Sequence, residues 1–284
     1  MGFYSPLRYP GGKGKLSEFL KLIFKNNLLC DGHYVEPYAG GASVALNLLF
    51  SEYAGRVIIN DLDRSVYSFW HSTIYHTEEL CELISKASLN LAEWRRQKEI
   101  QLCKSNCSLL KLGFSTFYLN RTNRSGILNG GVIGGVNQEG TWKIDARFNK
   151  SELINRIRRI GYYKDRISVY NLDACELIRK IVKSIPRKTL FYLDPPYFHK
   201  GQKLYVNYYR PEDHEVVAKT VRGLKNCRWV VSYDYTPEII KLYNQFPKRR
   251  YSINYSASKH SEGDEVMFFS DNLIVPAVKN PVKV

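Results

Sequence analysis

The sequence predicts an α/β fold, a doubly wound sheet interrupted by a mostly helical insertion. Three observations predict it. Apolar strand patterns alternate with helical patterns near both ends of the chain. Between the first two predicted strands lies a glycine-rich turn followed by an apolar helix, which is the opening unit of such a sheet. About one hundred residues then separate these strands from the rest, too many for an ordinary connection.

In the first part of the chain, each element follows from the local pattern. Apolar residues at helical spacing predict an amphipathic helix over 15–30. A strand that ends at Glu36 leads into a turn at 38–43 and an apolar helix through 44–49. The second strand, over 55–59, closes with a polar and an acidic residue.

The inserted segment is predicted to span 65–165. Residues 65–119 show mostly helical patterns, whereas Asn, Arg, Gly and Thr dominate 120–148. A long structureless loop within a compact domain is usually functional. A basic helix over 151–160 follows. The expected organisation is a main domain formed by 1–64 and 166–284 and an inserted domain formed by 65–165.

After the insertion, the alternation of strands and helices resumes. Strand patterns cover 167–170, 189–193, 228–232, 251–255 and 265–275, and helical patterns cover 174–184 and 211–225. The strand over 189–193 is apolar over almost its whole length, which is typical of a buried strand.

The formal net charge of the 284 residues is +15, and such a basic chain points to a polyanionic partner. The charge is also uneven. Residues 94–166 hold 15 Lys and Arg against 5 Asp and Glu, which gives this segment +10 of the total. The asymmetry favours a segment that lies on a phosphate backbone. The alternative is a solvated basic face.

Several other classes of protein are not favoured. No stretch approaches the ~18 apolar residues of a membrane span, and residues 1–6 lack the apolar core of a signal peptide. A cytoplasmic location is therefore expected. The six cysteines show no zinc spacing and are expected to be reduced and structural. No metal site is predicted.

The most informative motif follows the strand over 189–193. It consists of Asp194, Pro195, Pro196 and Tyr197. Neither proline has an N–H, so the strand ladder cannot continue. The free carbonyls and the Asp194 carboxylate form an acceptor-only cluster, and a planar ring can lie on Tyr197. This set suits the exocyclic amino group of a nucleobase that has left its stack; the alternative is a strand that ends in a proline-rich turn.

The glycine-rich turn offers a second candidate site. It lacks the spacing of a dinucleotide site, but Gly40 and Gly41 let a ligand approach the backbone closely. Asp61 lies 21 residues beyond Gly40, at the tip of the next strand. An acid at this place can accept hydrogen bonds from both hydroxyls of a ribose. The combination favours an adenosine-containing ligand without a pyrophosphate.

A short basic segment over 7–15 precedes the first helix. It lacks the spacing of a phosphate loop. Lys13, at the start of the helix, could neutralise a ligand carboxylate, and Tyr9 could stack on a ring. The alternative is a flexible basic arm.

Four motifs therefore follow one another along the chain. They are Tyr9-Pro-Gly-Gly-Lys13, Glu36-Pro-Tyr-Ala-Gly-Gly41, Asn60-Asp61 and Asp194-Pro-Pro-Tyr197. In this order they resemble the Dam-type, D12 class DNA adenine-N6 methyltransferases, and the resemblance spans nearly the whole chain. The stretch 119–126 looks like the family's entry into its DNA-recognition hairpin, and 264–267 resembles its C-terminal strand.

The resemblance implies a Rossmann-like methyltransferase fold with an inserted target-recognition domain, and S-adenosylmethionine as the methyl donor. Tyr9 falls where the family usually has a tryptophan against the cofactor, and Lys13 matches a lysine near the cofactor. Asp61 matches the ribose acid, and Asp194 matches the catalytic acid, also near the methionine moiety. The stretch 127–135 differs from the family's readers of GATC, so the target sequence stays open.

The expected reaction is site-specific methyl transfer to N6 of adenine in duplex DNA. The amino nitrogen is a poor nucleophile because its lone pair is delocalised into the ring. Asp194 and the Pro195 carbonyl would accept its two N–H bonds, which combines positioning with electrostatic stabilisation. Pro196 completes the motif, and Tyr197 would stack on the flipped base. Transfer would be direct, without a metal.

Further residues are candidates for binding. Glu36 could lie near the donor amino group, or could be a strand-end acid paired with a basic side chain. Asp173 could bind the donor's adenine amino group, or could cap the helix that follows it. The candidate DNA contacts are Asn120, Arg121, Asn123 and Arg124. Arg reads G and Asn reads A at base edges, but most protein–DNA contacts go to phosphate.

The residues leave two alternative functions open. One is an RNA or cytosine-N4 amino-methyltransferase, since Asp-Pro-Pro-Tyr serves exocyclic amines generally. The other is a catalytically silent DNA-binding module, against which the intact Asp61 and Asp194 argue. The expected partner is double-stranded DNA, with or without a cognate restriction nuclease, and the protein is expected to be a monomer.

Overall fold

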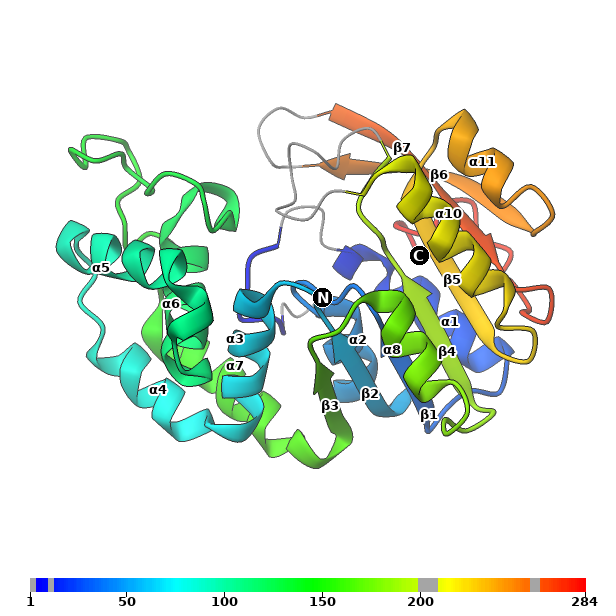
Figure 1. Ribbon diagram of the computed structural model, residues 1–284, viewed down its shortest axis with the longest axis horizontal. Coiled ribbons are helices and arrows are strands. Elements are labelled where there is room, and N and C mark those ends of the chain that lie inside the picture. Colours follow the sequence, from blue (N-terminus) through cyan, green and yellow to red (C-terminus); the bar gives the residue numbers. More distant parts are fainter. Residues whose placement is uncertain (1–3, 10–12, 199–208, 256–260) are drawn as a thin grey trace. The chain divides into compact units, whose positions relative to one another are not determined.

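The computed structural model describes residues 4–9, 13–198, 209–255 and 261–284. The chain divides into two compact units, whose elements are labelled in Figure 1. The first, here called the helical unit, comprises Met1–Gly12 and Asp63–Asn171. The second, here called the sheet unit, comprises Lys13–Leu62 and Leu172–Val284. Each unit is therefore built from two separate stretches of the chain.

The sheet unit is organised around parallel strands. Its strands are β1 (Gly32–Glu36), β2 (Ala54–Asn60), β4 (Thr189–Leu193), β5 (Arg228–Asp234), β6 (Lys248–Tyr255) and β7 (Ser261–Phe269). They lie in the order β2-β1-β4-β5-β7-β6. The first four are parallel to one another, whereas β7 is antiparallel to both β5 and β6. The predicted α/β class is confirmed, with an antiparallel edge added to the parallel core.

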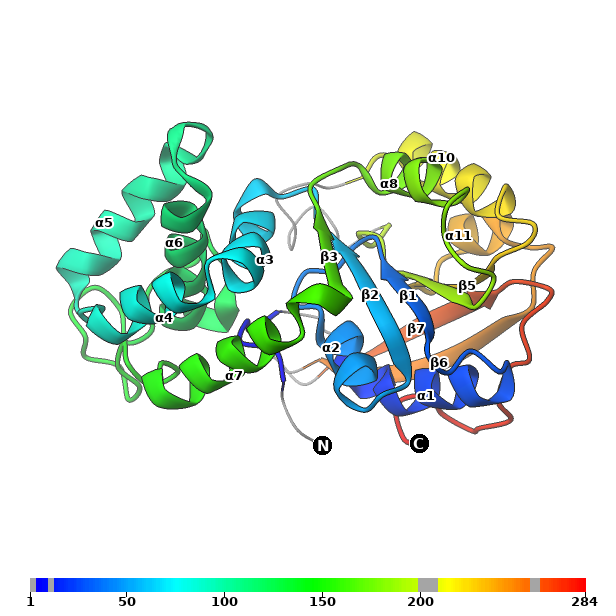
Figure 2. The same cartoon turned by 90° about the horizontal axis from the view of Figure 1, so that it is seen from below.

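Helices cover both faces of this sheet (Figure 2). On one face lie α1 (Ser17–Asn26), which continues the 3-10 turn η1 (Lys13–Leu16), and α2 (Ser43–Phe50); on the other lie α8 (Ala174–Ile181), α10 (Pro211–Arg222) and α11 (Pro237–Leu242). Because both faces are covered, every residue of β4 is buried. The buried side of α1 carries Phe19, Leu20, Ile23 and Phe24, the apolar stripe expected from helical spacing.

The order of the strands reverses between β1 and β4. From β1 the chain passes to β2 on one side, and it later returns to place β4 on the other side. Ligands of open α/β sheets bind at such a point, outside the carboxyl ends of the strands. Val35 pairs with Phe191 in the register of β1 and β4, so Glu36 and the end of β4 meet at this edge.

The helical unit consists mainly of helices, with a longer stretch of turns over 127–149. Its elements are α3 (Arg64–Tyr75), α4 (Thr77–Lys86), α5 (Leu91–Leu102), η2 (Lys104–Asn106), α6 (Leu109–Thr122), η3 (Arg124–Gly126), α7 (Lys150–Tyr162), η4 (Lys164–Arg166) and the strand β3 (Ile167–Tyr170). The side chains of Asp63, Asn90, Ser108 and Asn149 accept backbone N–H groups at the starts of α3, α5, α6 and α7. These capping residues explain where the helices begin.

The core of the helical unit depends on a close approach of α6 to α3. A Cβ atom at Gly113 would lie 2.5 Å from the carbonyl oxygen of Ser68, so a side chain does not fit there. Beside this point, the rings of Phe69 and Phe117 stack with centroids 5.9 Å apart, and Phe148 packs edge-on against Phe117.

Three details differ from the sequence prediction. The helix α11 is not predicted, because six residues started by Thr236 and Pro237 are too few to show a period. The last strand ends at Phe269 rather than at 275. The stretch 120–148 contains η3 and an isolated bridge between Asn123 and Val132 as well as turns. In the part of the chain that the structure describes, no helix is long and apolar enough to span a bilayer.

Candidate active site and DNA-contacting surface

Asp194 lies at the carboxyl end of β4, beside the end of β5. The hydroxyl of Ser232 donates to Asp194 Oδ1 at 2.8 Å, and the hydroxyls of Ser232 and Tyr192 are also 2.8 Å apart. The side chain of Asp194 keeps 18% of its surface exposed. Since Pro195 and Pro196 have no N–H groups, this end of the strand presents only acceptors.

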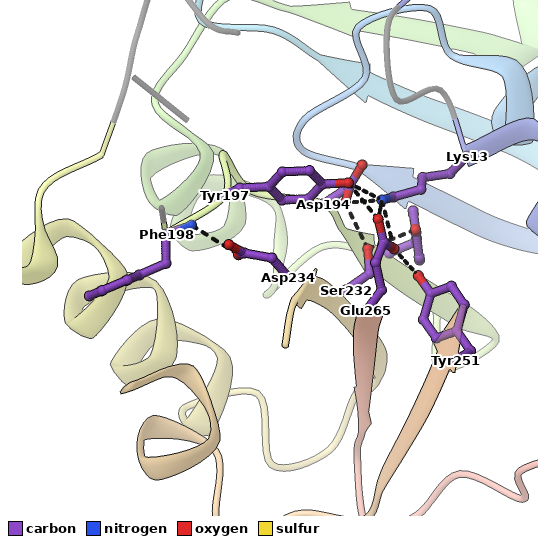
Figure 3. A network of polar contacts seen from close by, with 9 residues as sticks. Lys13, Asp194, Tyr197, Phe198, Ser232, Asp234, Tyr251 and Glu265 are labelled. Atoms are coloured by element: carbon purple, nitrogen blue, oxygen red, sulfur yellow. Dashed lines mark hydrogen bonds and ion pairs between the residues drawn. The ribbon is translucent and has the colours of Figure 1, made fainter. Parts of the chain in front are cut away.

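A buried lysine joins Asp194 to a second carboxylate (Figure 3). Lys13 Nζ donates to both carboxylate oxygens of Glu265, at 2.7 and 2.9 Å, and lies 3.4 Å from Asp194 Oδ1. The Tyr197 hydroxyl accepts from Lys13 at 2.8 Å and donates to Glu265 Oε1 at 2.5 Å. The Tyr251 hydroxyl donates to the other oxygen, Oε2. The network thus connects η1, the segment after β4 and the two last strands.

Burial and charge together set the ionisation of this network. Burial raises the pKa of Asp194 to about 6; the ammonium of Lys13 opposes the rise and the charge of Glu265 adds to it. Burial would also raise the pKa of Glu265, but Lys13 and the hydroxyls of Tyr197 and Tyr251 hold that pKa below its usual value. At neutral pH both carboxylates are ionised, so Lys13, Asp194 and Glu265 carry one net negative charge.

Glu36 is a buried acid at the end of β1. Burial raises its pKa well above the usual value; the backbone N–H of Ala45 opposes this rise, and the charge of Asp194 adds to it. Its Oε2 atom has no hydrogen-bond partner within the described residues. The basic partner that the sequence offered as an alternative is therefore not found among them. A buried carboxyl oxygen of this kind would be satisfied by a bound polar or cationic group.

The glycine-rich turn and the acid after β2 lie together, as their spacing predicts. The N–H of Gly40 donates to Asp61 Oδ2 at 3.0 Å, and Gly40 has a φ of +47°, a conformation that favours glycine. Beside them, the Asn60 amide donates to the carbonyl oxygens of Pro37 and Leu172, each at 2.9 Å. Asn60 thereby fixes the loops on either side of Asp61, which stays half-exposed at the strand tip.

Asp173 has the capping role that the sequence offered as its alternative. Its Oδ1 atom accepts the N–H groups of Cys175 at 2.9 Å and Glu176 at 3.2 Å, at the start of α8.

Across residues 4–9, 13–198, 209–255 and 261–284, no group of three or more His, Cys, Asp or Glu side chains is placed to hold a metal ion.

The motifs and their geometry agree with a comparison of the sequence with known families. The model of the family described as D12 class N6 adenine-specific DNA methyltransferase matches residues 9–258. The chain belongs to this family. It is therefore an adenine-specific DNA methyltransferase, a site-specific enzyme that transfers a methyl group from S-adenosylmethionine to N6 of adenine. The RNA, cytosine-N4 and catalytically silent alternatives are set aside.

Individual relatives of the methyltransferase are distant. The type II methyltransferase M.MjaIII of Methanocaldococcus jannaschii is 22% identical over 287 aligned residues, which cover 90% of this chain and 95% of that protein. Among solved structures, PH1948 of Pyrococcus horikoshii, a candidate RNA methyltransferase, matches with a TM-score of 0.43 and 10% identity, over 90% of this chain and 83% of its own. The rRNA methyltransferase aviRa of Streptomyces viridochromogenes matches with a TM-score of 0.36 and 11% identity, over 88% and 83%. The family assignment does not depend on these two structures.

The residues at the strand ends of this methyltransferase fit S-adenosylmethionine. The donor carries a cationic sulfonium, an amino group and a ribose with two hydroxyls. The unpartnered Glu36 Oε2 and the net negative charge around Asp194 suit the cationic groups. The half-exposed carboxylate of Asp61, held by the N–H of Gly40, suits the ribose.

Lys13 and Tyr197 lie deeper than the sequence suggests. Lys13 was expected to neutralise a ligand carboxylate, but its ammonium is buried against Glu265, a carboxylate of the protein itself. Tyr197 is buried, with 3% of its surface exposed, and its hydroxyl is held by Lys13 and Glu265. Tyr9 belongs to the helical unit and is half-buried there.

Two of the predicted DNA contacts, Asn120 and Asn123, lie inside the helical unit. The Asn120 amide accepts the N–H of Arg8 and donates to the carbonyl oxygens of Arg8 and Gly126, at 2.7 to 2.9 Å. The Asn123 amide accepts from the indole N–H of Trp94 at 2.7 Å and donates to two carbonyls of the following loop. With exposures of 4% and 0%, both amides face inward and shape the loop, which corrects the expectation that they reach DNA.

The two predicted arginines are placed differently. Arg124 is exposed. Arg121 is half-buried, and its Nε atom has no hydrogen-bond partner within the described residues. Burial, and after it the nearby charges of Arg8 and Arg156, lower the pKa of Arg121 to about 10; Glu152 opposes this. The cationic side chains that act on one another here, called the arginine cluster below, are Arg8, Arg121, Arg147 and Arg156.

Sequence reasoning gave no role to Glu265, Ser232 or Tyr251 in the sheet unit. One signal for Glu265 exists: it directly precedes the apolar run 266–269, where a charged residue is unusual unless it is paired. Its partner, Lys13, lies near the other end of the chain. No local pattern connects the two.

Proposed function

We propose that methyl transfer takes place at the carboxyl ends of β4 and β5, with Asp194 accepting an N–H of the target amino group. The observation that carries this proposal is that the protein contacts one oxygen of the Asp194 carboxylate, Oδ1, more than the other. Within the described residues, the Ser232 hydroxyl and the Lys13 ammonium both approach Oδ1. Oδ2 therefore remains to accept from a substrate, on a side chain that is still partly exposed.

The proposed reaction needs a methyl donor and two hydrogen-bond acceptors for the target amino group. When bound, S-adenosylmethionine supplies an electrophilic methyl group on a sulfonium. Asp194 Oδ2 and the Pro195 carbonyl accept the two N–H bonds of the adenine amino group, which directs the nitrogen lone pair out of the ring plane. The absence of N–H groups on Pro195 and Pro196 keeps competing donors away from the amino group. The target adenine must leave the duplex stack to reach these acceptors.

Donor binding is proposed for the residues around the first two strands. Asp61 accepts the ribose hydroxyls, and the close backbone approach at Gly40 allows the donor to lie on the turn. Glu36 faces the donor's cationic end, and Lys13 acts through its carboxylate partners. Tyr9 supplies an aromatic face for the donor, and Asp173, through its capped loop, lies near the donor's adenine; these two assignments rest on the resemblance of their motifs.

The helical unit is proposed to recognise the DNA target. The arginine cluster and the exposed Arg124 give it an excess of positive charge that suits a phosphate backbone. Asn120 and Asn123 hold the loop that presents Arg124. Double-stranded DNA is the proposed partner, the proposed location is the cytoplasm, and the proposed state is a monomer, which acts with or without a cognate nuclease.

The test replaces Asp194 in the full-length protein. Asp194→Ala should reduce methylation of duplex DNA at least ~100-fold, the scale seen when one stabilising polar group is removed, with DNA affinity retained. Asp194→Asn should fail as well, because its amide presents N–H donors toward an amino group. The exposed Asp271→Ala serves as the matched control and should keep wild-type activity. Activity of either Asp194 variant within a few-fold of wild type would refute the assignment.

A further inference from the structure

The buried network around Lys13 contains one carboxylate that the proposed reaction does not use. Glu265 lies on β7, opposite Asp234 of β5 and opposite Tyr251 of β6. It is fully buried, yet four hydrogen bonds from three side chains converge on it: two from Lys13 and one each from Tyr197 and Tyr251. Burying a second acid this close to Asp194 is unfavourable, so its presence calls for a reason.

The distances show how Lys13 is shared between the two acids. Its ammonium contacts both oxygens of Glu265, at 2.7 and 2.9 Å, whereas Asp194 Oδ1 lies at 3.4 Å. Lys13 is therefore held chiefly by Glu265. A carboxylate engaged fully by an ammonium is a weaker acceptor for any other donor.

We propose that Glu265 is a positioning residue, which holds the Lys13 ammonium away from a full ion pair with Asp194 and so keeps the Asp194 carboxylate available to the substrate amino group. The proposal rests on the proposed role of Asp194. It gives the two tyrosines a purpose as well, since the hydroxyls of Tyr197 and Tyr251 occupy the lone pairs of Glu265 and fix its orientation.

The groups close to Asp194 come from several elements of the sheet unit. Lys13 faces it from η1 and Glu265 from β7, and the Tyr192 hydroxyl reaches it through Ser232. The buried acid Glu36, whose own pKa is raised by burial and by the charge of Asp194, lies at the end of β1. The buried hydroxyls of Tyr34 on β1 and Tyr251 on β6 are also close enough to feel its charge. Among the groups that the structure describes here, Lys13 lowers the pKa of Asp194 and Glu265 raises it, so variants of these two residues test the positioning role.

The variants Glu265→Gln and Lys13→Met are expected to shift the pKa of Asp194 in opposite directions. In Glu265→Gln a like charge is lost and Lys13 becomes free to pair with Asp194, so the pKa of Asp194 should fall by about one unit or more from its value of about 6. In Lys13→Met the neutralising cation is lost and that pKa should rise. A variant that only disturbed the packing of the site would not produce pKa shifts of opposite sign in the two proteins.

The measurement uses the full-length protein without cofactor. Aspartate carboxyl carbons labelled with ¹³C are titrated by NMR, and the Asp194 resonance is identified by its loss in Asp194→Asn. The pH profile of methylation is recorded in parallel: Glu265→Gln should lower the plateau rate on the order of 10-fold and move the acidic limb to lower pH, and Glu265→Asp should recover part of the rate. Tyr251→Phe keeps every charge and should shift the limb less than Glu265→Gln.

The outcomes distinguish the inference from the proposed function. Glu18→Gln removes a surface ion pair with Lys21 of the same unit and should change nothing. If Glu265→Gln and Lys13→Met leave the Asp194 resonance where it is, or move it in the same direction, the positioning role of Glu265 is wrong even when Asp194→Ala is inactive. If Asp194→Ala stays active, the proposed function fails whatever the titration shows. Should Lys13→Met not fold, Glu265→Gln and Glu265→Asp still decide the matter.

Discussion

The sheet unit and the helical unit both bury ionised groups, but they differ in how far the buried charges are balanced. In the sheet unit, Lys13 stands between two carboxylates, and the three groups together carry one negative charge. In the helical unit, the acid that opposes the arginine cluster at Arg121 is Glu152, which pairs with Arg156, so positive charge is in excess among the described residues of the cluster. One cluster is nearly balanced and the other is far from balance.

The difference shows what each region is built to meet. A nearly balanced pocket with a slight negative excess suits a cationic donor and an amino group, because a small net charge costs little while the ligand is away. An unbalanced positive cluster is unfavourable in the free protein and becomes favourable only against a polyanion. In both places the pKa shift runs against stability: upward for the acid Asp194 and downward for the base Arg121.

The largest effect that would sharpen this contrast concerns DNA affinity. The double variant Arg121→Gln/Arg147→Gln should bind duplex DNA ~10- to 100-fold more weakly at ~0.1 M salt. The slope of log affinity against log salt should become shallower by ~1.8, since about 0.9 is lost for each phosphate contact. Fluorescence anisotropy at several salt concentrations, on target and scrambled duplexes, measures both quantities.

A matched control lies in the same unit. Arg158 is exposed and forms a two-pronged ion pair with Glu78, so Arg158→Gln removes one positive charge outside the cluster. Its salt slope should stay near that of the wild type. A loss in Arg158→Gln about half that of the double variant, in proportion to the charges removed, would mean that total charge, and not the cluster, governs binding. An unchanged slope with lost discrimination between duplexes would instead assign Arg121 or Arg147 to base reading.

The contrast also separates what the sequence could predict from what it could not. Asp194, Gly40 and Asp61 follow from the rule that ligands gather at the carboxyl ends of parallel strands, and the structure places Gly40 and Asp61 in contact. The alternation of strands and helices in the sequence predicts the α/β sheet. Applied to that sheet, the rule predicts the edge at which the site lies.

Other features depend on which way a side chain faces, and the sequence does not show this. Asn120 and Asn123 lie in a polar, basic stretch, but at the end of helix α6 and directly after it both amides face inward, where they bind backbone carbonyls. Glu265 and Lys13 meet only because β7 enters the sheet between β5 and β6. Such pairing comes from the tertiary fold, so no local period announces it.

A second prediction addresses donor binding in the sheet unit. Asp61→Ala should weaken binding of S-adenosylmethionine by roughly 10- to 100-fold, because hydrogen bonds to a charged group contribute roughly 1.5–3 kcal/mol. Calorimetric titration measures the affinity. The exposed Asp31→Asn, directly before β1, is the control, because asparagine tolerates the left-handed φ of +63° at this position. Unchanged affinity in Asp61→Ala would make the contact with Gly40 a purely structural one.

The smallest expected effect concerns stability. The pKa of Asp194 is higher in the folded chain than in an unfolded chain, so ionisation of this group lowers stability progressively as the pH rises from about 4 through about 6. Asp194→Asn removes this penalty and should raise the free energy of unfolding at pH 8 by about 1 kcal/mol, a fraction of the ~3 kcal/mol that the full shift represents, because Lys13 loses a partner.

Urea unfolding at pH 8 and pH 5 checks the sign. The advantage of Asp194→Asn over the wild type should shrink at pH 5, where the wild-type carboxyl is largely protonated in the folded state. A variant that is less stable than the wild type at both pH values would show that the ion pair with Lys13 outweighs the burial of Asp194, and that the balanced cluster supports the fold.

The pairing of Lys13 with Glu265 spans 252 positions of the chain. During synthesis the lysine therefore leaves the ribosome long before its partner. β6, although made earlier, can join the sheet only through β7, which lies between it and β5. A nascent or prematurely terminated chain that lacks β7 can form the parallel strands and present Asp194, yet its lysine has only that acid to bind. The buried network beside Asp194 therefore forms only after β7 has been made and has entered the sheet.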